Sequence, residues 1–379
     1  MEKLLLIPGP SPVVPRILAA LAAPTVSHVG PDHVADLRSA LDDLKRFVYC
    51  RDGQPFLVAG AGTLAMEIAV LNTVGPDDRL LVLSQGFFGD RMAEIAASFD
   101  LAHDVLRSPW GQVVPPEEML RAVAEKGSTV VACTHVDTGT GACAPVRAYA
   151  EALRSRGLLF IVDGVCATGG LEERMDDWGI DVILSAAQKC FGAPPGLALD
   201  VFSVRALEKR RRLGRVPAYY SDILRWLPIM QDPARYFSTP CVNEMRAFAE
   251  ACRIMREEGL EARFVRQARL GAAVRAGLRA LGFGLFTDET CLADTLSVVL
   301  YPEGVPDVPF RTLLSENGVV VAGGLGPTAG RVFRMGHMGN LSGAEVLEAL
   351  EAVETTLRGL GHPFEAGLSR TAAAAALAR

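Results

Sequence analysis

The sequence predicts an α/β protein with a mostly parallel sheet, one antiparallel strand in that sheet, helices covering both faces, and a smaller C-terminal α+β domain. Five short runs of Val, Leu and Ile alternate with segments of helical composition, which is typical of a parallel sheet buried on both faces. A sixth run follows the fifth too closely for a helical crossover. From about residue 282 the pattern changes to mixed strands and helices.

The length and composition of the chain favour two domains with large cores. Its 379 residues exceed one typical domain, half of them are hydrophobic and 22% are charged, which argues against disorder. We expect an extended N-terminal segment over residues 1–20, a large domain over 21–255 and a small C-terminal domain over 256–379.

The elements of the large domain follow from punctuation and periodicity. Residues 4–15 are interrupted by proline and glycine, which predicts an extended segment. Helical periodicity starts near Pro15 and again over 32–49, and segments such as 64–74 and 90–99 have helical composition. The apolar runs predict strands at residues 56–60, 79–84, 129–135, 158–163, 181–185 and 197–204.

The turn between the last two runs predicts the antiparallel strand. About a dozen residues separate the run that ends at Ser185 from the run that begins at Leu197, and two glycines and two prolines lie among them. A crossover helix does not fit this spacing, so we expect the chain to return beside the strand that it has just left.

Helices and a second, smaller sheet are expected after residue 204. A basic helix comes first, a polar and aromatic loop covers 219–236, and a long helical stretch covers 242–281. The alanine-rich end, residues 371–379, is only weakly determined. In the small domain we expect strands at 296–301, 319–322 and 332–335, and helices at 309–316 and 345–360.

The charge pattern argues against a nucleic-acid partner. The net charge is −6, and we interpret the one basic tract, residues 209–212, as the solvated face of a helix. No apolar segment is long enough to span a bilayer, and the apolar run near residue 5 is too short for a signal peptide. We therefore expect a cytoplasmic protein with no membrane partner.

The cysteines and histidines predict no metal site. No two cysteines form a CxxC pair, and the six histidines do not cluster. Free and mostly buried thiols are expected instead. The eight cysteines stand at positions 50, 133, 143, 166, 190, 241, 252 and 291.

Several polar or glycine-rich turns follow the predicted strands, and ligands collect at the carboxyl ends of strands in open α/β sheets. Gly60-Ala-Gly-Thr63 leads into a helix, which suits a phosphate, although a tight strand-to-helix turn also requires glycine. Phe87 and Phe88 suit either core packing or contact with a flat ring. Asp163 directly follows the fourth strand, where it serves a ligand or caps a turn.

Lys189 differs from the other four lysines because it follows an apolar strand, whereas they occupy ordinary solvated contexts. Burial lowers the pKa of a lysine from about 10.4, and a neutral amine can form a Schiff base with a carbonyl group. The simpler interpretation is a lysine that reaches from a strand end into solvent. A phosphate turn, an aromatic face, a carboxylate and a desolvated lysine on one rim are together what pyridoxal phosphate requires.

Specific motifs extend this interpretation. The most specific are Gln188-Lys189 with the following Ala193-Pro-Pro-Gly196, and Phe333-Arg-Met-Gly-His-Met-Gly339. Further stretches that match are Pro8-Gly-Pro-Ser-Pro12, Gly60-Ala-Gly-Thr-Leu-Ala-Met-Glu67, Val162-Asp-Gly164 and Ala322-Gly-Gly-Leu-Gly-Pro327. Over nearly its whole length the sequence resembles the class V, fold type I, pyridoxal phosphate-dependent aminotransferases, specifically the alanine–glyoxylate, serine–pyruvate and serine–glyoxylate group.

The resemblance implies a role for each matching residue. Lys189 is expected to hold the cofactor as a Schiff base and then to shuttle a proton, Asp163 to pair with the pyridinium, and Arg334 to bind the substrate carboxylate. The other implied positions are Gly62, Thr63 and Gln188 at the phosphate, Phe88 (or else Phe87) stacked on the ring, Thr138 near the ring, Gly9 at the substrate, and Tyr236 and Thr239 reaching the phosphate of the other subunit in a homodimer.

Three positions depart from the family pattern and leave the amino-acid preference open. The Thr-Ser-Thr-Gly element reads Thr138-Gly-Thr-Gly141, the Asp-Ala-Val-Ser-Ser element reads Asp163-Gly-Val-Cys-Ala167, and the usual serine of the phosphate turn is Ala61. None of these changes removes the lysine, the aspartate or the arginine.

The expected function is transfer of an amino group from a small amino acid (alanine, serine or glycine) to a small 2-oxo acid (glyoxylate or pyruvate) through a ping-pong cycle. The alternatives are a related transaminase that acts on ureidoglycine, aminoethylphosphonate or pyridoxamine, a cysteine desulfurase-like enzyme, and a non-catalytic protein that binds pyridoxal phosphate. A desulfurase requires a cysteine on a mobile loop, and the late part of the chain offers only Cys291.

Overall fold

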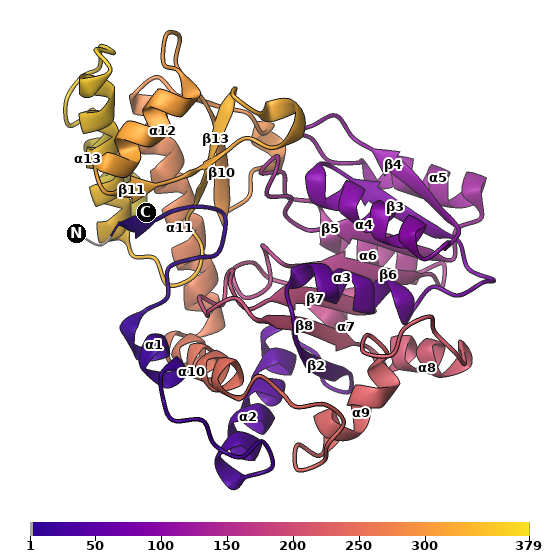
Figure 1. Ribbon diagram of the computed structural model, residues 1–379. Coiled ribbons are helices and arrows are strands. Elements are labelled where there is room, and N and C mark those ends of the chain that lie inside the picture. The colour runs from indigo at the N-terminus through magenta and orange to yellow at the C-terminus, as the bar shows by residue number, and fades with distance from the viewer. Residues whose placement is uncertain (1–2, 379) are drawn as a thin grey trace.

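The computed structural model describes residues 3–378, so residues 1, 2 and 379 of the expected end segments lie outside the described part (Figure 1). Its centre is a seven-stranded sheet with strand order β2-β8-β7-β6-β5-β3-β4. The strands are β2 (Gln54–Ala59), β3 (Leu80–Ser84), β4 (His103–Arg107), β5 (Val130–Thr134), β6 (Leu159–Asp163), β7 (Val182–Ala186) and β8 (Leu197–Phe202).

The predicted α/β class and the antiparallel return strand are both confirmed. β8 pairs antiparallel with β2 on one side and with β7 on the other, whereas the neighbouring pairs from β7 to β4 are parallel. All six predicted strands are present within a few residues. β4 was not predicted, because this edge strand is half exposed and its polar residues His103, Asp104 and Arg107 interrupt the apolar run.

Helices cover both faces of this sheet. α2 illustrates why they form where they do: Pro31 occupies the first turn, Asp32 complements the positive end of the helix dipole, and Lys45 and Arg46 complement the negative end. The helices of this part are α1 (Pro15–Leu21), α2 (Pro31–Phe47), α3 (Gly62–Leu71), α4 (Phe87–Ser98), α5 (Pro116–Lys126), α6 (Val146–Arg154), α7 (Met175–Trp178), α8 (Val204–Arg212) and α9 (Ile223–Gln231).

The prediction of a loop over residues 219–236 is wrong in the middle of that range, where α9 forms. Asp222 caps this helix by accepting a hydrogen bond from the Leu224 amide, and the side chain of Trp226 is buried. Pro228 lies inside the helix. The proline and the surrounding polar residues concealed the helical pattern, which burial against the rest of the domain stabilises.

The basic tract of α8 is not simply a solvated face, contrary to our expectation. Arg210 is 1% exposed, forms an ion pair with Asp222 at 2.7 Å and donates to the Gly214 carbonyl at 2.9 Å. Lys209 pairs with Asp78. A buried guanidinium is tolerated here because its donors meet fixed acceptors.

The long helical stretch is two helices, α10 (Val242–Glu258) and α11 (Leu260–Ala280), separated by Gly259 with φ +82°. Buried side chains of α10 join the core of the large sheet, whereas those of α11 from Leu270 onward join a second core. That second core is built from β9 (Gly284–Leu285), β10 (Leu296–Leu300), α12 (Asp307–Glu316), β11 (Val319–Val320), β12 (Ala322–Gly323), β13 (Val332–Gly336), α13 (Gly343–Gly359) and α14 (Leu368–Leu377), together with α11.

The two ends of the chain meet this second core (Figure 1). β1 (Leu4–Leu5) pairs parallel with β11, and Leu6 is buried in the same cluster, so the extended N-terminal segment touches both cores before α1 begins. α14 is regular where we expected a weakly determined end: it packs against α11, and Ala373 is fully buried. Small side chains permit this close contact.

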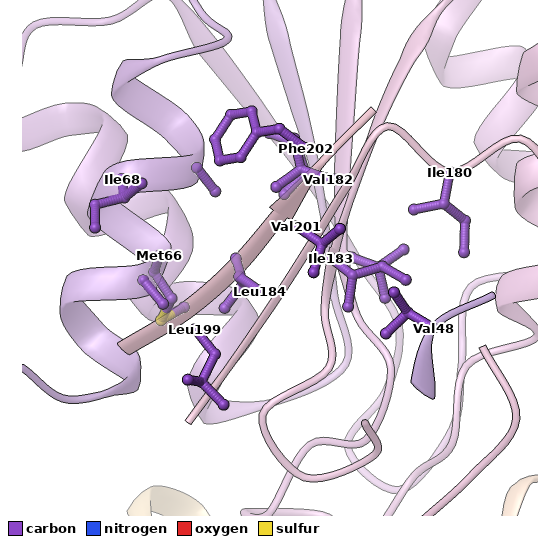
Figure 2. Packing of buried hydrophobic residues seen from close by; sticks show 14 of the residues in the cluster. Val48, Met66, Ile68, Ile180, Val182, Ile183, Leu184, Leu199, Val201 and Phe202 are labelled. Atoms are coloured by element: carbon purple, nitrogen blue, oxygen red, sulfur yellow. The ribbon is translucent and has the colours of Figure 1, made fainter. Parts of the chain in front are cut away.

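The core beside β7 and β8 positions the catalytic candidates. In Figure 2, Met66 and Ile68 of α3 lie on one side of these strands, and Val48 and Ile180 lie on the other. Because the sheet is covered on both faces, its strands are apolar in nearly every position. The eight cysteines are free and mostly buried, as predicted. None of the helices within residues 3–378 is long and apolar enough to cross a membrane.

One residue of β8 breaks the apolar pattern. Asp200 is fully buried, and no donor within the described residues reaches either of its carboxyl oxygens. Burial raises the pKa of Asp200 well above its usual value, so the folded protein keeps a proton that the unfolded chain releases near pH 4, at about its ordinary pKa. The contribution of Asp200 to stability therefore falls as the pH rises above about 4.

We predict that Asp200→Val raises the free energy of unfolding by about 1–3 kcal/mol at neutral pH, because it removes a buried polar group without partners. The gain over the wild type should be larger at pH 8 than at pH 4, as measured by urea unfolding. Asp200→Asn is the control, since it removes the titration and retains the polar group. A wild type that is as stable as Asp200→Val at pH 8 would contradict the prediction.

Candidate active site

A cavity of about 140 Å³ lies at the carboxyl ends of the central parallel strands, next to the N-termini of α3 and α4. Seven of the residues that the sequence analysis singled out line it together: Gly62, Thr63, Phe88, Thr138, Asp163, Gln188 and Lys189. Its other lining residues are Ala61, Met66, Arg91, Thr134, Val136, Val165 and Cys166.

The lysine is held by the N-terminal segment. Lys189 Nζ donates to the carbonyl of Pro8, the amide of Ser11 donates to the Gln188 carbonyl at 2.9 Å, and the Ser11 hydroxyl donates to the Lys189 carbonyl at 2.8 Å. A Cβ on Gly9, whose φ is +84°, would lie 2.6 Å from Lys189 Nζ. The predicted substrate position Gly9 thus contacts the lysine itself and admits no side chain.

A buried arginine fixes the turn that carries the lysine. Arg263, in the first turn of α11, is fully buried and donates to the carbonyls of Cys190 at 2.6 Å, Gly169 at 3.0 Å and Gly339 at 3.1 Å. Its charge is balanced by Glu258 at 2.6 Å. This guanidinium therefore ties the residue after Lys189 to the second core.

Asp163 ends β6 and is buried at the cavity wall. Its carboxyl oxygens accept hydrogen bonds from the Val165 amide at 3.0 Å and, at 3.5 Å, from the Thr134 hydroxyl, which are both uncharged donors. Burial, opposed by the bond from Val165 and reinforced by the nearby carboxyl groups of Asp137 and Glu173, raises the pKa of Asp163 to about 7. A cationic group in the cavity would restore the carboxylate, which is what a protonated ring nitrogen offers.

The phosphate candidates also have the required features. The residue that precedes α3, Ala61, makes no capping bond with its side chain, so amide groups of the first turn face the cavity region at the positive end of the helix. The side-chain oxygen Oε1 of Gln188 is buried and has no partner among the described residues. A ligand that carries phosphate oxygens for the free amides and a hydroxyl donor for Gln188 Oε1 would satisfy these atoms.

Asp137 positions the aromatic face. Its carboxylate accepts hydrogen bonds from the amides of Phe88 at 2.8 Å and Gly139 at 2.7 Å. A Cβ on Gly139 would approach Asp137 Oδ1 at 3.0 Å and Phe87 Cβ at 3.2 Å, so the glycine at this departure from the family pattern leaves space for both groups. Phe88 lines the cavity, whereas Phe87 is not among the lining residues.

Arg91 is a cavity residue that the sequence analysis missed. Its guanidinium lies over the rings of Phe87 and Phe88, at 5.1 and 4.9 Å from their centroids. The spacing of three and four residues on one helix is the signal that could have revealed it, because such residues share a helix face.

Arg334 lies at the junction of the two cores. From β13 it donates to the Gly323 carbonyl at 2.7 Å and to the Thr138 carbonyl at 3.1 Å, and within residues 3–378 no acidic side chain pairs with it. Burial lowers the pKa of Arg334, although Cys166 and Asp137 act in the opposite direction. A half-buried guanidinium that bonds only carbonyls is suited to an anion.

Tyr236 and Thr239 do not join the cavity of their own chain. Both are exposed, their hydroxyl groups lie 3.4 Å apart, and the Tyr236 ring packs against His28 at a centroid distance of 5.3 Å. They are not among the residues that line the cavity. A role for them at a phosphate therefore requires a second subunit.

Fold and site together define a class of protein. A mostly parallel sheet brings a lysine and a buried carboxyl group to one cavity with a helix N-terminus, which is the arrangement of the pyridoxal phosphate-dependent transferases. Residues 18–338 match the family model "Aminotransferase class-V", and the chain belongs to this family. It is a pyridoxal phosphate-dependent transaminase.

Individual relatives agree with this assignment. The chain is 36% identical to an uncharacterized aminotransferase of Methanocaldococcus jannaschii, over 95% of this chain and 94% of that protein. It resembles the structure of ureidoglycine–glyoxylate aminotransferase from Bacillus subtilis with a TM-score of 0.94 at 28% identity, covering 100% and 99% of the two chains. It resembles the structure of alanine–glyoxylate aminotransferase from Nostoc with a TM-score of 0.91 at 32% identity, covering 94% and 96%.

We predict that Gly9→Ala displaces the Lys189 side chain and strongly reduces transaminase activity, because the new methyl group would lie only 2.6 Å from Lys189 Nζ and closer still to Cδ. Gly304→Ala is the matched control: Gly304 has a similar φ of +81°, but nothing lies within 4 Å of its Cβ position. Both variants should lose about 1 kcal/mol of stability through backbone strain. Equal activity of the two variants would contradict the role of Gly9.

Proposed function

We propose that this transaminase moves an amino group from a small amino acid, alanine or serine, to a small 2-oxo acid, glyoxylate or pyruvate, in a ping-pong cycle. The observation that carries the proposal is the cavity of about 140 Å³ in which Lys189 and Asp163 meet the start of α3, while Arg334 donates to the carbonyl of the lining residue Thr138. Two similar structures are named for transfer to glyoxylate, which supports that acceptor. Ureidoglycine, aminoethylphosphonate or pyridoxamine are the alternative donors.

The residues present fit pyridoxal phosphate. Amides at Gly62 and Thr63 and the Gln188 side chain would hold its phosphate, and the Phe88 ring would lie against its pyridine ring. Asp163 would accept a hydrogen bond from the ring nitrogen and keep it protonated. When bound, the cofactor supplies an aldehyde that condenses with amines and a ring that accepts an electron pair.

Lys189 has two tasks in this proposal. Its amino group would hold the cofactor covalently until the substrate amine takes its place, and Nζ would then carry a proton away from the substrate Cα. The Pro8 carbonyl, which accepts a hydrogen bond from Nζ, keeps the amine near the cavity wall, and Gly9 allows it to approach.

Arg334 would bind the carboxylate that amino acids and 2-oxo acids share. A guanidinium offers two parallel donors to a carboxylate, and those of Arg334 that bond Gly323 and Thr138 fix its plane. Met66, Val136 and Val165 line the cavity with apolar surface, which would keep water away from a bound substrate and would limit the length of its side chain. These features favour small substrates.

A homodimer with shared active sites completes the proposal. Tyr236 and Thr239 are exposed away from the cavity of their own chain, which supports a contribution to the phosphate site of a partner subunit. Cys291 is buried, and its thiol donates to the Gly111 carbonyl at 3.4 Å, so it does not support a desulfurase. The cytoplasmic location and the absence of nucleic-acid partners stay predictions from the sequence.

We expect the protein, once loaded with pyridoxal phosphate, to lose its visible cofactor band on addition of L-alanine or L-serine and to regain it with glyoxylate or pyruvate. Lys189→Ala should not complete this cycle, because no amine of the protein can displace the product. A spectrophotometric screen of single half-reactions measures this. A response to ureidoglycine, aminoethylphosphonate or pyridoxamine, without any response to alanine, serine or glycine, would reject the proposed donors.

Arg334→Ala should raise the KM for amino acids about 10- to 100-fold, since a charge-assisted hydrogen bond contributes about 1.5–3 kcal/mol. Steady-state kinetics with alanine and serine provide the measurement. Arg331→Ala is the control, because Arg331 precedes the same strand and is exposed. An unchanged KM in Arg334→Ala would show that another group binds the carboxylate.

A further inference from the structure

A buried cluster of three polar side chains lies directly behind Asp163, and the proposed function uses none of them. His135, Thr168 and Glu173 are 6%, 1% and 0% exposed. The amide of His135 donates to the Asp163 carbonyl at 2.8 Å, so the cluster is joined to the backbone of the residue that faces the cofactor site.

The three side chains satisfy one another. His135 Nδ1 donates to Glu173 Oε1 at 2.6 Å, and the Thr168 hydroxyl donates to Glu173 Oε2 at 2.7 Å. Both oxygens of a fully buried carboxyl group therefore have a donor. A buried acid without such donors would be strongly unfavourable, which makes this a fixed unit.

Gly164 connects the cluster with Asp163. A Cβ at this position would lie 2.8 Å from Glu173 Oε1 and closer still to the Thr168 hydroxyl. Position 164 accepts only glycine while Thr168 and Glu173 are present, which accounts for the departure from the family pattern at this residue. The Gly164 amide donates to the Leu184 carbonyl at 2.8 Å, so the turn after Asp163 is held from two sides.

The charges of the cluster oppose each other. Burial acts to lower the pKa of His135, but contact with Cys143 and with the Glu173 carboxylate outweighs it and raises the pKa of His135 to about 10. A protonated imidazole in this contact, 2.6 Å from the Glu173 carboxylate, forms an ion pair without net charge. The other ionisable groups that interact electrostatically with this pair are the thiols of Cys143, Cys133 and Cys190 and the carboxyl group of Asp163. Glu173 by itself acts to raise the pKa of Asp163.

We propose that His135 and Glu173 form a positioning pair for Asp163: the pair fixes the Asp163–Gly164 turn, and the His135 cation cancels the Glu173 charge behind the carboxylate. The proposal rests on the function proposed above, in which Asp163 must stay ionised opposite a protonated ring nitrogen. Neither member of the pair reaches the cavity, so each acts through Asp163.

The test compares His135→Asn, Glu173→Gln and the double variant in the holoenzyme. His135→Asn leaves the Glu173 carboxylate without a compensating cation behind Asp163. The dissociation constant of pyridoxal phosphate should then rise about tenfold, which corresponds to a shift of about one unit in the pKa of Asp163. Glu173→Gln can accept the bond from His135 on its amide oxygen and donate its NH2 group to the Thr168 hydroxyl, so it should change the dissociation constant by less than about threefold. The double variant should bind the cofactor as Glu173→Gln does, because loss of the Glu173 charge compensates for loss of the His135 cation.

A pH titration of the cofactor band separates the effect of charge from simple structural damage. The pH midpoint of the visible cofactor band should shift in His135→Asn and return toward the wild-type value in the double variant. Glu172→Gln is the matched control, because Glu172 adjoins Glu173 in sequence but lies at the surface, paired with Arg174. Additive losses in the double variant, or a His135→Asn enzyme with wild-type affinity and midpoint, would overturn the proposal.

Nitrogen NMR of labelled histidines provides a test that does not require His135→Asn to fold. One of the six histidines should stay protonated at pH 8 in the wild type and lose that proton in Glu173→Gln. Six histidines that are all neutral at pH 8 would overturn the proposal. Failure of the proposed function looks different, because the wild type would then not bind pyridoxal phosphate through Lys189 at all.

Discussion

The buried guanidinium of Arg263 is the interaction on which the geometry of the site depends. It donates to carbonyls of three segments that are distant in sequence, at Gly169, Cys190 and Gly339, and its charge is balanced by Glu258. Replacing one partner of such a buried pair usually destabilises a protein by about 3–5 kcal/mol, because unpaired groups stay in the interior. The segment that contains Lys189 therefore has one position relative to α11 and the second core.

The strands were predictable from the sequence where both faces of the sheet are buried. Strands covered on both faces are apolar throughout, so β5, β6 and β7 were found from composition, and the short Gly/Pro-rich gap before β8 revealed the change of direction. Edge strand β4 and helix α9 were missed, because polar residues in one and Pro228 in the other hide their periodicity. Arg210 was misjudged, since a basic tract does not reveal which of its residues meets Asp222.

The site was predictable from strand ends but not from tertiary contacts. Lys189 and Asp163 follow neighbouring parallel strands, and the topology alone brings them to one cavity. Arg91 and Glu173 belong to no motif, and only folding places them beside Phe88 and Gly164. Two departures from the family pattern acquire a physical reason in this way: Thr168 and Glu173 fill the space that a side chain at position 164 would need, and Gly139 leaves room for Asp137 and Phe87.

Under the proposed function, substrate choice would depend on the junction between the two cores. Arg334 belongs to β13 of the second core, yet one of its bonds goes to Thr138, which follows β5 of the large sheet. The position of a substrate carboxylate bound to Arg334 would therefore depend on how the two cores lie relative to each other. The amino group of the same substrate would meet Lys189, which belongs to the large sheet alone. Arg263, which lies outside the cavity, also links the two cores through the carbonyls of Cys190 and Gly339, so it would help to set the distance between Arg334 and Lys189.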